Sequence, residues 1–134
     1  MSDPAHPDSC RLTIRVRYSE CDPMGVAHHT AYPVWFEMGR TELLRSRGLT
    51  YRDVEAQGIF LAVIDLSVKY RRPARYDDEL TLQTRVAKVS HVKIAHAYTL
   101  YRDDDVLATA NTTLACLDRD GRARPIPGMI ATPV

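Results

Sequence analysis

The sequence predicts an α+β fold in which an antiparallel sheet curls around one long helix. Five stretches alternate apolar and polar side chains, as half-buried strands do. A long run with helical spacing of apolar residues lies between the first and second of these stretches, and the later stretches are joined by short linkers. A mostly apolar helix among so few elements is buried only if the sheet wraps around it.

The first strand is expected at residues 11–18, where "RLTIRVRY" places four apolar side chains on one face and arginine or threonine on the other. The next segment, "CDPMG" at 21–25, has the composition of a turn. Pro23 fixes its own φ and Gly25 tolerates a positive φ. The strand is therefore expected to stop before this segment.

The long helix is expected at about residues 31–47. Thr30 suits the N-cap, Pro33 is tolerated in the first turn, and Gly48 provides a C-terminal stop. Apolar residues occupy nearly all sides of its first half. We therefore expect this helix to be buried.

A short connecting helix and four strands complete the pattern. The helix is expected within residues 50–58, with Thr50 and Asp53 as a weak capping box and Gly58 as the terminator. The strands are expected at 59–70, 79–89, 91–101 and 106–117. Because their linkers are short, we expect antiparallel neighbours.

Length and composition indicate a globular domain. The chain has 134 residues, of which 45% are hydrophobic and 26% charged. We expect a single domain over 1–134, with residues 1–10 and 122–134 as peripheral tails. The 18 basic and 17 acidic residues nearly cancel, which argues against disorder and against a generic nucleic-acid binder.

The sequence contains no signal for a membrane, a disulfide framework or a metal. No apolar run reaches the length of a membrane span, and the polar start "MSDPAHPDS" does not resemble a secretion leader. We expect a cytoplasmic protein. Cys10, Cys21 and Cys116 are odd in number and widely spaced, which predicts neither disulfides nor a zinc site.

Asp22 is the first candidate for chemistry, because it stands between a strand and the start of a helix. Free N–H groups in the first turn of a helix, here including that of His29, bind anions and oxyanions. A carboxylate on one side of a carbonyl and such N–H groups on the other form a hydrolytic site. On local pattern alone, Asp22 can equally start an Asp-Pro turn.

The segment "YSECDPMGVAHHTAYPVWFE" (18–37) closely resembles the signature of hotdog-fold acyl-CoA thioesterases of the 4-hydroxybenzoyl-CoA thioesterase-like family. The resemblance continues through "LSVKYRRPARYDDEL" (66–80). It implies a hotdog fold, in which a five-stranded antiparallel sheet wraps a long central helix. It also implies a homodimer that pairs edge to edge, with the active site at the interface, and a tetramer of paired dimers.

The resemblance assigns roles to three residues of the loop. Asp22 corresponds to the catalytic carboxylate, acting as a general base on water or as a nucleophile that forms a mixed anhydride. The backbone N–H of His29 corresponds to the donor that polarises the thioester carbonyl, and Gly25 lets the loop turn beneath the substrate. Thiolate is a good leaving group, so hydrolysis of acyl-CoA needs neither a metal nor a cofactor other than the coenzyme A of the substrate.

Five residues are candidates for substrate binding. Tyr32, Trp35 and Phe60 are expected to line an acyl pocket, although aromatic residues on a buried helix and strand are commonly core. His91 and Lys93, together with the basic run "KYRRPAR" (69–75), are expected to contact coenzyme A phosphates. Solvated charges of an edge strand explain that run equally well.

Several alternatives remain open. Cys21 beside His28 is a candidate nucleophile, and the adjacent His28 and His29 are candidate metal ligands, although a structural cysteine and solvent-facing or substrate-facing imidazoles are more common. Glu37 is a second candidate for the essential carboxylate, or forms an ion pair with Arg40 three residues on. The rival functions are an enoyl-CoA hydratase of the same fold and a non-catalytic acyl-CoA-binding module.

Overall fold

The computed structural model describes residues 2–3 and 6–131. Its elements, in chain order, are β1 (Ser2–Asp3), β2 (His6–Arg15), the 3-10 turn η1 (Tyr18–Glu20), α1 (Ala31–Ser46), α2 (Tyr51–Ala56), β3 (Phe60–Tyr70), β4 (Glu79–Val89), β5 (Lys93–Arg102), β6 (Asp105–Leu117) and α3 (Gly128–Ala131). The order of long strands and helices confirms the α+β prediction.

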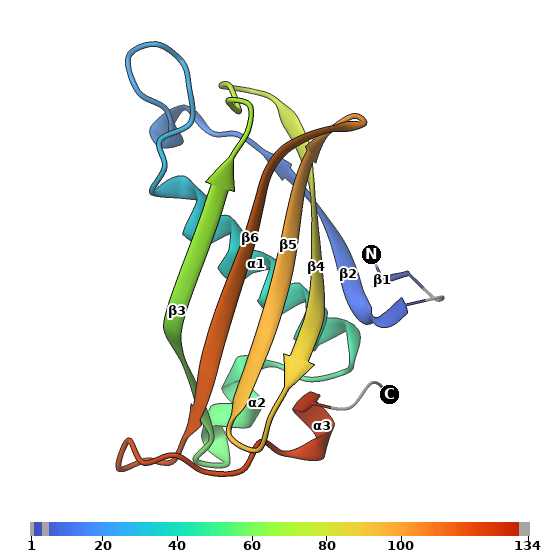
Figure 1. Ribbon diagram of the computed structural model, residues 1–134, viewed down its shortest axis with the longest axis vertical. Helices are drawn as coiled ribbons and strands as arrows, with labels where there is room; N and C mark the ends of the chain where they lie inside the picture. Colours follow the sequence, from blue (N-terminus) through green and yellow to red (C-terminus); the bar gives the residue numbers. More distant parts are fainter. Residues whose placement is uncertain (1, 4–5, 132–134) are drawn as a thin grey trace.

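The strands form one antiparallel sheet in the order β1-β2-β4-β5-β6-β3, in which β1 has only two residues. The five long strands curl around α1 (Figure 1). Because neighbouring strands are antiparallel, the loop before α1, the loop after β3 and the β5–β6 turn gather at one end of the sheet. The β4–β5 turn and α2 lie at the other end (Figure 1).

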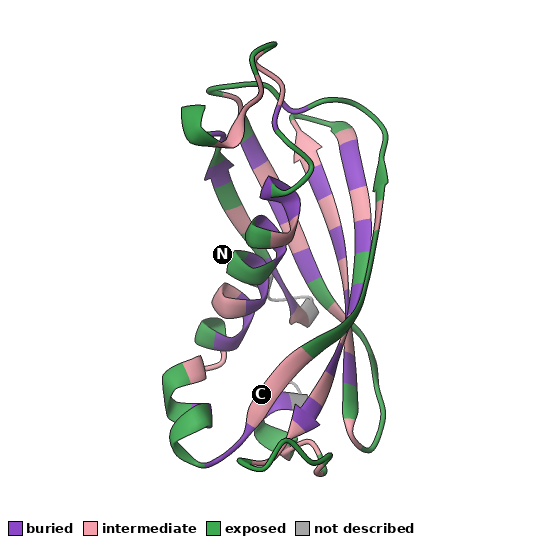
Figure 2. Ribbon diagram, turned by 90° about the vertical axis from the view of Figure 1, so that its left-hand side faces the viewer, coloured by how far each residue is buried: buried purple, intermediate pink, exposed green. Residues whose placement is uncertain are grey.

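The helix packs on the concave face of the sheet, and its buried residues point toward the strands (Figure 2). Trp35 and Phe36 are each only 1% exposed. The helix lies close against the sheet at Gly39, where an added Cβ would lie 2.9 Å from Leu82 Cδ2 and collide with Thr84 Oγ1. Glycine at this position therefore allows the close approach.

One expectation about α1 is wrong, and a second holds only in part. Val34 and Met38 are 50% and 41% exposed, so the described chain does not cover the first half of the helix on all sides. Thr30 occupies the N-cap position as expected, but it makes no side-chain cap, because its backbone is already helical and its Oγ1 bonds to His28 Nδ1 at 2.8 Å. The first N–H groups of α1 are therefore not capped by this side chain.

Other boundaries hold. Gly48 and Gly58 follow their helices with φ of +80° and +79°, the left-handed conformation that glycine tolerates best. Thr50 Oγ1 accepts the Asp53 N–H at 3.1 Å, as the cap of α2 requires. The strand expected from residue 91 begins at Lys93, after a bend.

Parts of both ends, which were expected to be peripheral, contact the rest of the fold. Strand β2 begins at His6 and pairs with β4, and Ser9 and Cys10 are buried. It ends at Arg15 rather than at residue 18, because the chain then forms the turn η1. Near the other end, Ile130 is buried and its carbonyl accepts Arg47 Nη1 at 2.6 Å. None of the described helices is both long and apolar enough to cross a membrane.

Candidate active site

Residues 16–30, which we call the Asp22 loop, close on themselves through backbone hydrogen bonds. The Asp22 N–H donates to the Val26 carbonyl, and the Gly25 N–H donates to the Asp22 carbonyl, both at 2.9 Å. Gly25 has φ of +77°, which confirms the predicted need for glycine in this turn. The two arms of the loop also meet in a bridge between Cys21 and Ala27.

The half-buried Asp22 side chain caps the turn with one oxygen. Its Oδ1 accepts the N–H groups of Met24 at 2.9 Å and Val26 at 3.1 Å. Within residues 2–3 and 6–131, no donor is bonded to Oδ2. Asp22 can therefore stabilise the Asp-Pro turn with one oxygen and keep the other available for chemistry. The structural and the catalytic interpretations of Asp22 are compatible.

The His29 N–H points away from the helix. The preceding carbonyl, that of His28, accepts the Ala31 N–H at 3.0 Å and so is directed along α1. In a trans peptide the C=O and N–H point in opposite directions, which directs the His29 N–H out of the helix start. No described residue accepts a hydrogen bond from it. It is therefore available to a carbonyl oxygen.

A hollow of about 300 Å³, which we call the upper hollow, lies between the start of α1 and the end of β3. It is lined by Val26, Ala27, His29, Tyr32, Tyr70, Arg71, Arg72 and Pro73. Tyr70 donates its hydroxyl to the His29 carbonyl at 3.4 Å, and its ring lies edge-on to that of Tyr32 with centroids 4.8 Å apart. Burial raises the pKa of both phenols, so both stay neutral at physiological pH. Asp22 does not line this hollow.

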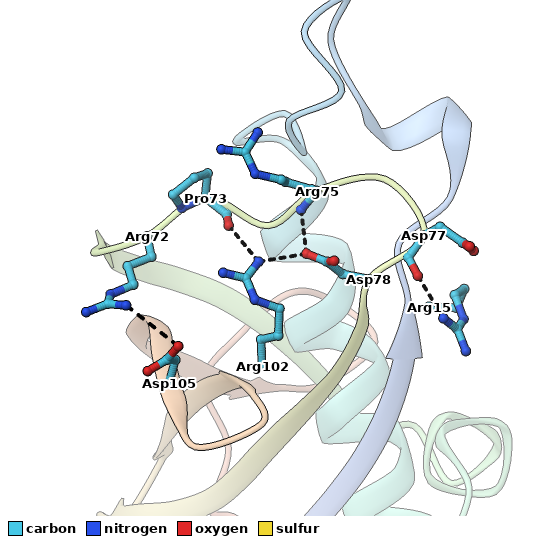
Figure 3. Close-up of polar contacts among 8 residues, drawn as sticks. All are labelled: Arg15, Arg72, Pro73, Arg75, Asp77, Asp78, Arg102 and Asp105. Atoms are coloured by element: carbon cyan, nitrogen blue, oxygen red, sulfur yellow. Dashed lines mark hydrogen bonds and ion pairs between the residues drawn. The ribbon is translucent and has the colours of Figure 1, made fainter.

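The loop after β3, residues 71–78, forms one wall of the upper hollow and is braced by Arg102 of β5 (Figure 3). Arg102 Nη1 donates to the Pro73 carbonyl at 3.2 Å and to Asp78 Oδ2 at 2.8 Å. Asp78 Oδ2 also accepts the Arg75 N–H at 2.9 Å. Asp78 thereby holds both the backbone of this loop at Arg75 and the side chain of Arg102 in place.

The same wall is hydrogen-bonded to the Asp22 loop. The Ala27 N–H donates to the Ala74 carbonyl at 2.8 Å, and the Tyr76 N–H donates to the Gly25 carbonyl at 2.9 Å. Ala74 is completely buried. The Asp22 loop, the start of α1 and the wall of the hollow are thus one connected unit.

A second hollow of about 430 Å³, which we call the lower hollow, lies further along α1. Its lining residues are Glu37, Arg40, Thr41, Tyr51, Glu55, Leu61, Val63 and Leu114. Glu37 is exposed, and the ion pair expected between Glu37 and Arg40 is absent from the described chain. Arg40 turns inward instead and is 8% exposed. Glu37 therefore stays open to solvent or substrate.

The remaining aromatic candidates do not line the upper hollow. Trp35 is core, as the alternative interpretation held, and its indole N–H donates to Glu20 Oε2 at 2.8 Å. Phe60 is half-buried at the start of β3. Tyr70, which lines the upper hollow, is the last residue of this 11-residue strand, so Phe60 lies about 33 Å from Tyr70 at the usual rise per residue. One protomer therefore brings only Tyr32 of the three to the upper hollow.

His91 and Lys93 lie at the β4–β5 turn, at the opposite end of the sheet from the Asp22 loop (Figure 1). Both are exposed, and Lys93 lines a separate surface hollow with Lys88 and Ser90. One protomer does not bring them to Asp22. Their expected contact with coenzyme A stays a prediction that requires a second subunit.

The rival nucleophile and metal site gain no support. Burial and the neighbouring charges of Glu20 and Asp22 raise the pKa of the Cys21 thiol, which disfavours the reactive thiolate. Over the described ranges, no group of three or more His, Cys, Asp or Glu side chains is arranged to hold a metal ion. His28 uses its Nδ1 on Thr30.

Sequence reasoning missed two residues of this site. Glu20 contacts α1 from within the Asp22 loop, and Tyr70 reaches the start of the helix from β3. The position of Glu20, two residues before Asp22, was a usable signal. The contact of Tyr70 depends on how β3 lies against α1, which no local pattern contains.

Comparison with known proteins identifies the family and the fold. Residues 16–134 match the model of the thioesterase-like superfamily. A curated relative, the putative acyl-CoA thioesterase YneP of Bacillus subtilis, is 32% identical over 108 residues, which are 80% of this chain and 78% of YneP.

Solved structures show the same architecture. The DHNA-CoA thioesterase of Staphylococcus aureus is 32% identical with a TM-score of 0.82, covering 93% of this chain and 84% of that one. A mutant 4-hydroxybenzoyl CoA thioesterase has the same fold, with a TM-score of 0.82 at 19% identity, covering 92% of this chain and 96% of its own. These neighbours confirm the hotdog fold.

Proposed function

Because the chain belongs to the thioesterase-like superfamily and is a thioester hydrolase, we propose that it hydrolyses acyl-CoA with Asp22 activating the attack on the carbonyl. The observation that carries this proposal is the free His29 N–H at the start of α1, in the same loop as a carboxylate with one uncommitted oxygen. These are the two components that ester-type hydrolysis requires.

In this proposal the thioester carbonyl lies at the edge of the upper hollow that His29 forms, between this hollow and Asp22, and accepts the His29 N–H. That hydrogen bond strengthens as negative charge develops on the oxygen, and so it stabilises the transition state more than the bound substrate. Asp22 Oδ2 removes a proton from the attacking water, or attacks the carbon itself to form a mixed anhydride that water hydrolyses after coenzyme A has left. The tetrahedral intermediate then expels coenzyme A as a thiolate, which needs little help from a general acid.

The proposed assembly is a homodimer that pairs through β3, with a tetramer formed from two such dimers. β3 ends the sheet order, so its outer edge is free in the described chain. The register with β6 places three apolar side chains on the helix-facing side of β3, because each is paired with a buried residue of β6. These side chains, Val63, Leu66 and Tyr70, are nevertheless 49%, 41% and 50% exposed. Antiparallel pairing of two β3 strands covers this edge and brings the start of the partner's β3 beside the upper hollow.

Coenzyme A phosphates are proposed to meet Arg71 and Arg72 at the rim of the upper hollow. Arg71 forms no ion pair with any described residue, and the Arg72–Asp105 pair is long and exposed at 3.6 Å. Both guanidinium groups are thus available to an anion. His91 and Lys93 take part only from the partner subunit.

The first experiment measures thiol release from short aliphatic, long aliphatic and aromatic acyl-CoAs by the wild type, Asp22→Asn and Asp104→Asn. Asp104, in the exposed β5–β6 turn, is the matched control. We expect the near-isosteric change at Asp22 to lower kcat by about 10²-fold or more and the control to leave it unchanged. Circular dichroism checks that all three are folded.

Each other outcome has a definite meaning. Undiminished activity of Asp22→Asn would reject its role and direct attention to Glu37, which lies open in the lower hollow. Consumption of an enoyl-CoA without release of thiol would indicate a hydratase. Tight binding of intact acyl-CoA without turnover would indicate a binding module.

A further inference from the structure

Glu20 is an almost buried carboxylate to which the proposed reaction gives no role. Its side chain is 8% exposed. Oε1 accepts the Arg17 N–H at 2.8 Å, while Oε2 accepts the Trp35 indole N–H at 2.8 Å and the Arg17 guanidinium at 3.3 Å. The bond to Trp35 joins the Asp22 loop to the second turn of α1.

The backbone of Glu20 joins the same loop to itself. Its carbonyl accepts the His28 N–H at 2.7 Å, immediately before the peptide whose N–H is free. Glu20 is therefore bonded to α1 through its side chain and, through its backbone, to the segment that carries the free His29 N–H. It also lies two residues from Asp22, the proposed catalytic carboxylate.

We infer that Glu20 is a positioning residue, which sets the place of Asp22 relative to the His29 N–H and α1. The inference rests on the proposed function, because it concerns the alignment of those two groups. Misplacement of a reacting group by about 1 Å can cost about 10²-fold in rate. A group that fixes such a distance therefore acts on kcat without touching the substrate.

The chemistry of the contacts requires a carboxylate here. All three partners of the Glu20 side chain are donors, so only a group with two acceptor oxygens satisfies them. The guanidinium of Arg17 is 67% exposed, so its ion pair contributes little by itself. The indole bond, made by a core side chain, is the contact that fixes the loop against the helix.

The test compares Glu20→Gln, Glu20→Asp and the control Glu42→Gln. Glutamine keeps the size but turns a donor toward donors, and aspartate keeps the charge but is one methylene too short to keep both the Arg17 and Trp35 contacts. Glu42 makes an exposed ion pair with Arg45 on the same helix and is far from the loop in sequence. Steady-state kinetics on one acyl-CoA is measured well below each variant's Tm.

We expect both Glu20 variants to lower kcat by about 10-fold to 10²-fold with KM changed less than about threefold, which is the signature of a contact needed only in the transition state. Glu42→Gln should match the wild type. An unchanged kcat in folded Glu20 variants, a change in KM alone, or a lowered Tm without a kinetic effect would overturn the inference. Failure of both variants to fold would overturn it in favour of a structural role.

A combination with Asp22→Asn separates this inference from the proposed function. If Glu20 acts through Asp22, Glu20→Gln should cause little further loss once Asp22 is replaced, because residues that act as a unit are not additive. If Asp22→Asn alone is fully active, the proposed function fails. If Asp22→Asn is inactive while Glu20→Gln retains wild-type kcat, only the positioning role fails.

Discussion

Arg40 and Tyr98 meet inside the core, where Arg40 Nη1 donates to the Tyr98 hydroxyl at 3.0 Å. The same hydroxyl lies 2.6 Å from Thr112 Oγ1, and the Tyr98 ring stacks on Phe36 with centroids 4.6 Å apart. Burial, and the positive charges of Arg40 and Arg47, lower the pKa of the neighbouring His96 to about 3. His96 is therefore neutral at physiological pH, and the hydroxyl of Tyr98, together with that of Tyr51, is a polar partner that makes a buried Arg40 tolerable.

Removing this hydroxyl should destabilise the protein. Tyr98→Phe removes the hydroxyl that bonds to both Arg40 and Thr112 in the core, and Arg40 keeps only its bond to the Tyr51 hydroxyl, so we expect a cost of about 1–3 kcal/mol. Urea unfolding measures the difference. The control is Tyr101→Phe on the same strand, whose hydroxyl makes no hydrogen bond in the described chain and whose loss should matter by less than about 0.5 kcal/mol. Equal effects of the two substitutions would refute the role given to Tyr98.

The contact between Gly39 and β4 makes a second prediction about stability. Helix propensity alone favours Gly39→Ala by about 1 kcal/mol. The added methyl, however, collides with Thr84 Oγ1, and overpacking of a core costs about 1–3 kcal/mol. We expect a net loss of stability in thermal unfolding. Thr84→Ala in the same chain should recover part of it, and a stabilised Gly39→Ala would show that the helix lies further from the sheet.

Much of this fold is predictable because its signals are local. The alternation in β4 and β6 and the glycines after α1 and α2 each determine their own element, and the positive φ of Gly25 follows from one turn. The ends of the chain were missed for a physical reason. The start of β2 does not alternate, and its pairing with β4 and the burial of Ile130 depend on surfaces supplied by distant elements.

The candidate site likewise contains residues that a local motif identifies and residues whose positions depend on tertiary packing. Asp22, Gly25 and His29 are neighbours in sequence, so a motif can identify them together. The inward turn of Arg40 and the reach of Tyr70 to His29 are set by the packing of α1 against β3, β5 and β6. Phe60 at the start of β3, and His91 and Lys93 at the β4–β5 turn, lie at the opposite end of the sheet from the Asp22 loop, and this separation follows only from the assembled strands (Figure 1).

Gly25 provides a test of the turn itself. At φ of +77° an L-residue is strained, costing roughly 1–2 kcal/mol, although no atom within 4 Å would clash with an added Cβ. Asparagine adopts this conformation more readily than alanine. We expect kcat to fall in the order glycine, Gly25→Asn, Gly25→Ala. Equal activity of the two variants would show that backbone conformation at this position does not limit the reaction.

The dependence of stability on pH should report the state of Glu20. Burial would raise its pKa, but the bonds from Arg17 and Trp35 and the charge of Arg17 outweigh burial and lower the pKa below its ordinary 4.5. A group with a lowered folded pKa stabilises the protein above its unfolded pKa, and this contribution is lost as pH falls through the folded pKa. The Tm difference between wild type and Glu20→Gln should therefore be constant above about pH 5.5 and shrink below the ordinary pKa. A difference that grows on acidification would contradict this assignment.

Val63 provides the test of the β3 dimer. A charge placed on the exposed, helix-facing side of β3 would be buried without a partner when two β3 strands pair, which is strongly unfavourable. Val63→Asp should therefore be monomeric in light scattering coupled to gel filtration, and it should lose activity together with the dimer. Val89→Asp is the matched control, because Val89 is 38% exposed at the end of β4, away from the β3 edge. A fully active monomer of Val63→Asp would show that one subunit contains the complete site, and a dimer in both variants would locate the subunit contact elsewhere.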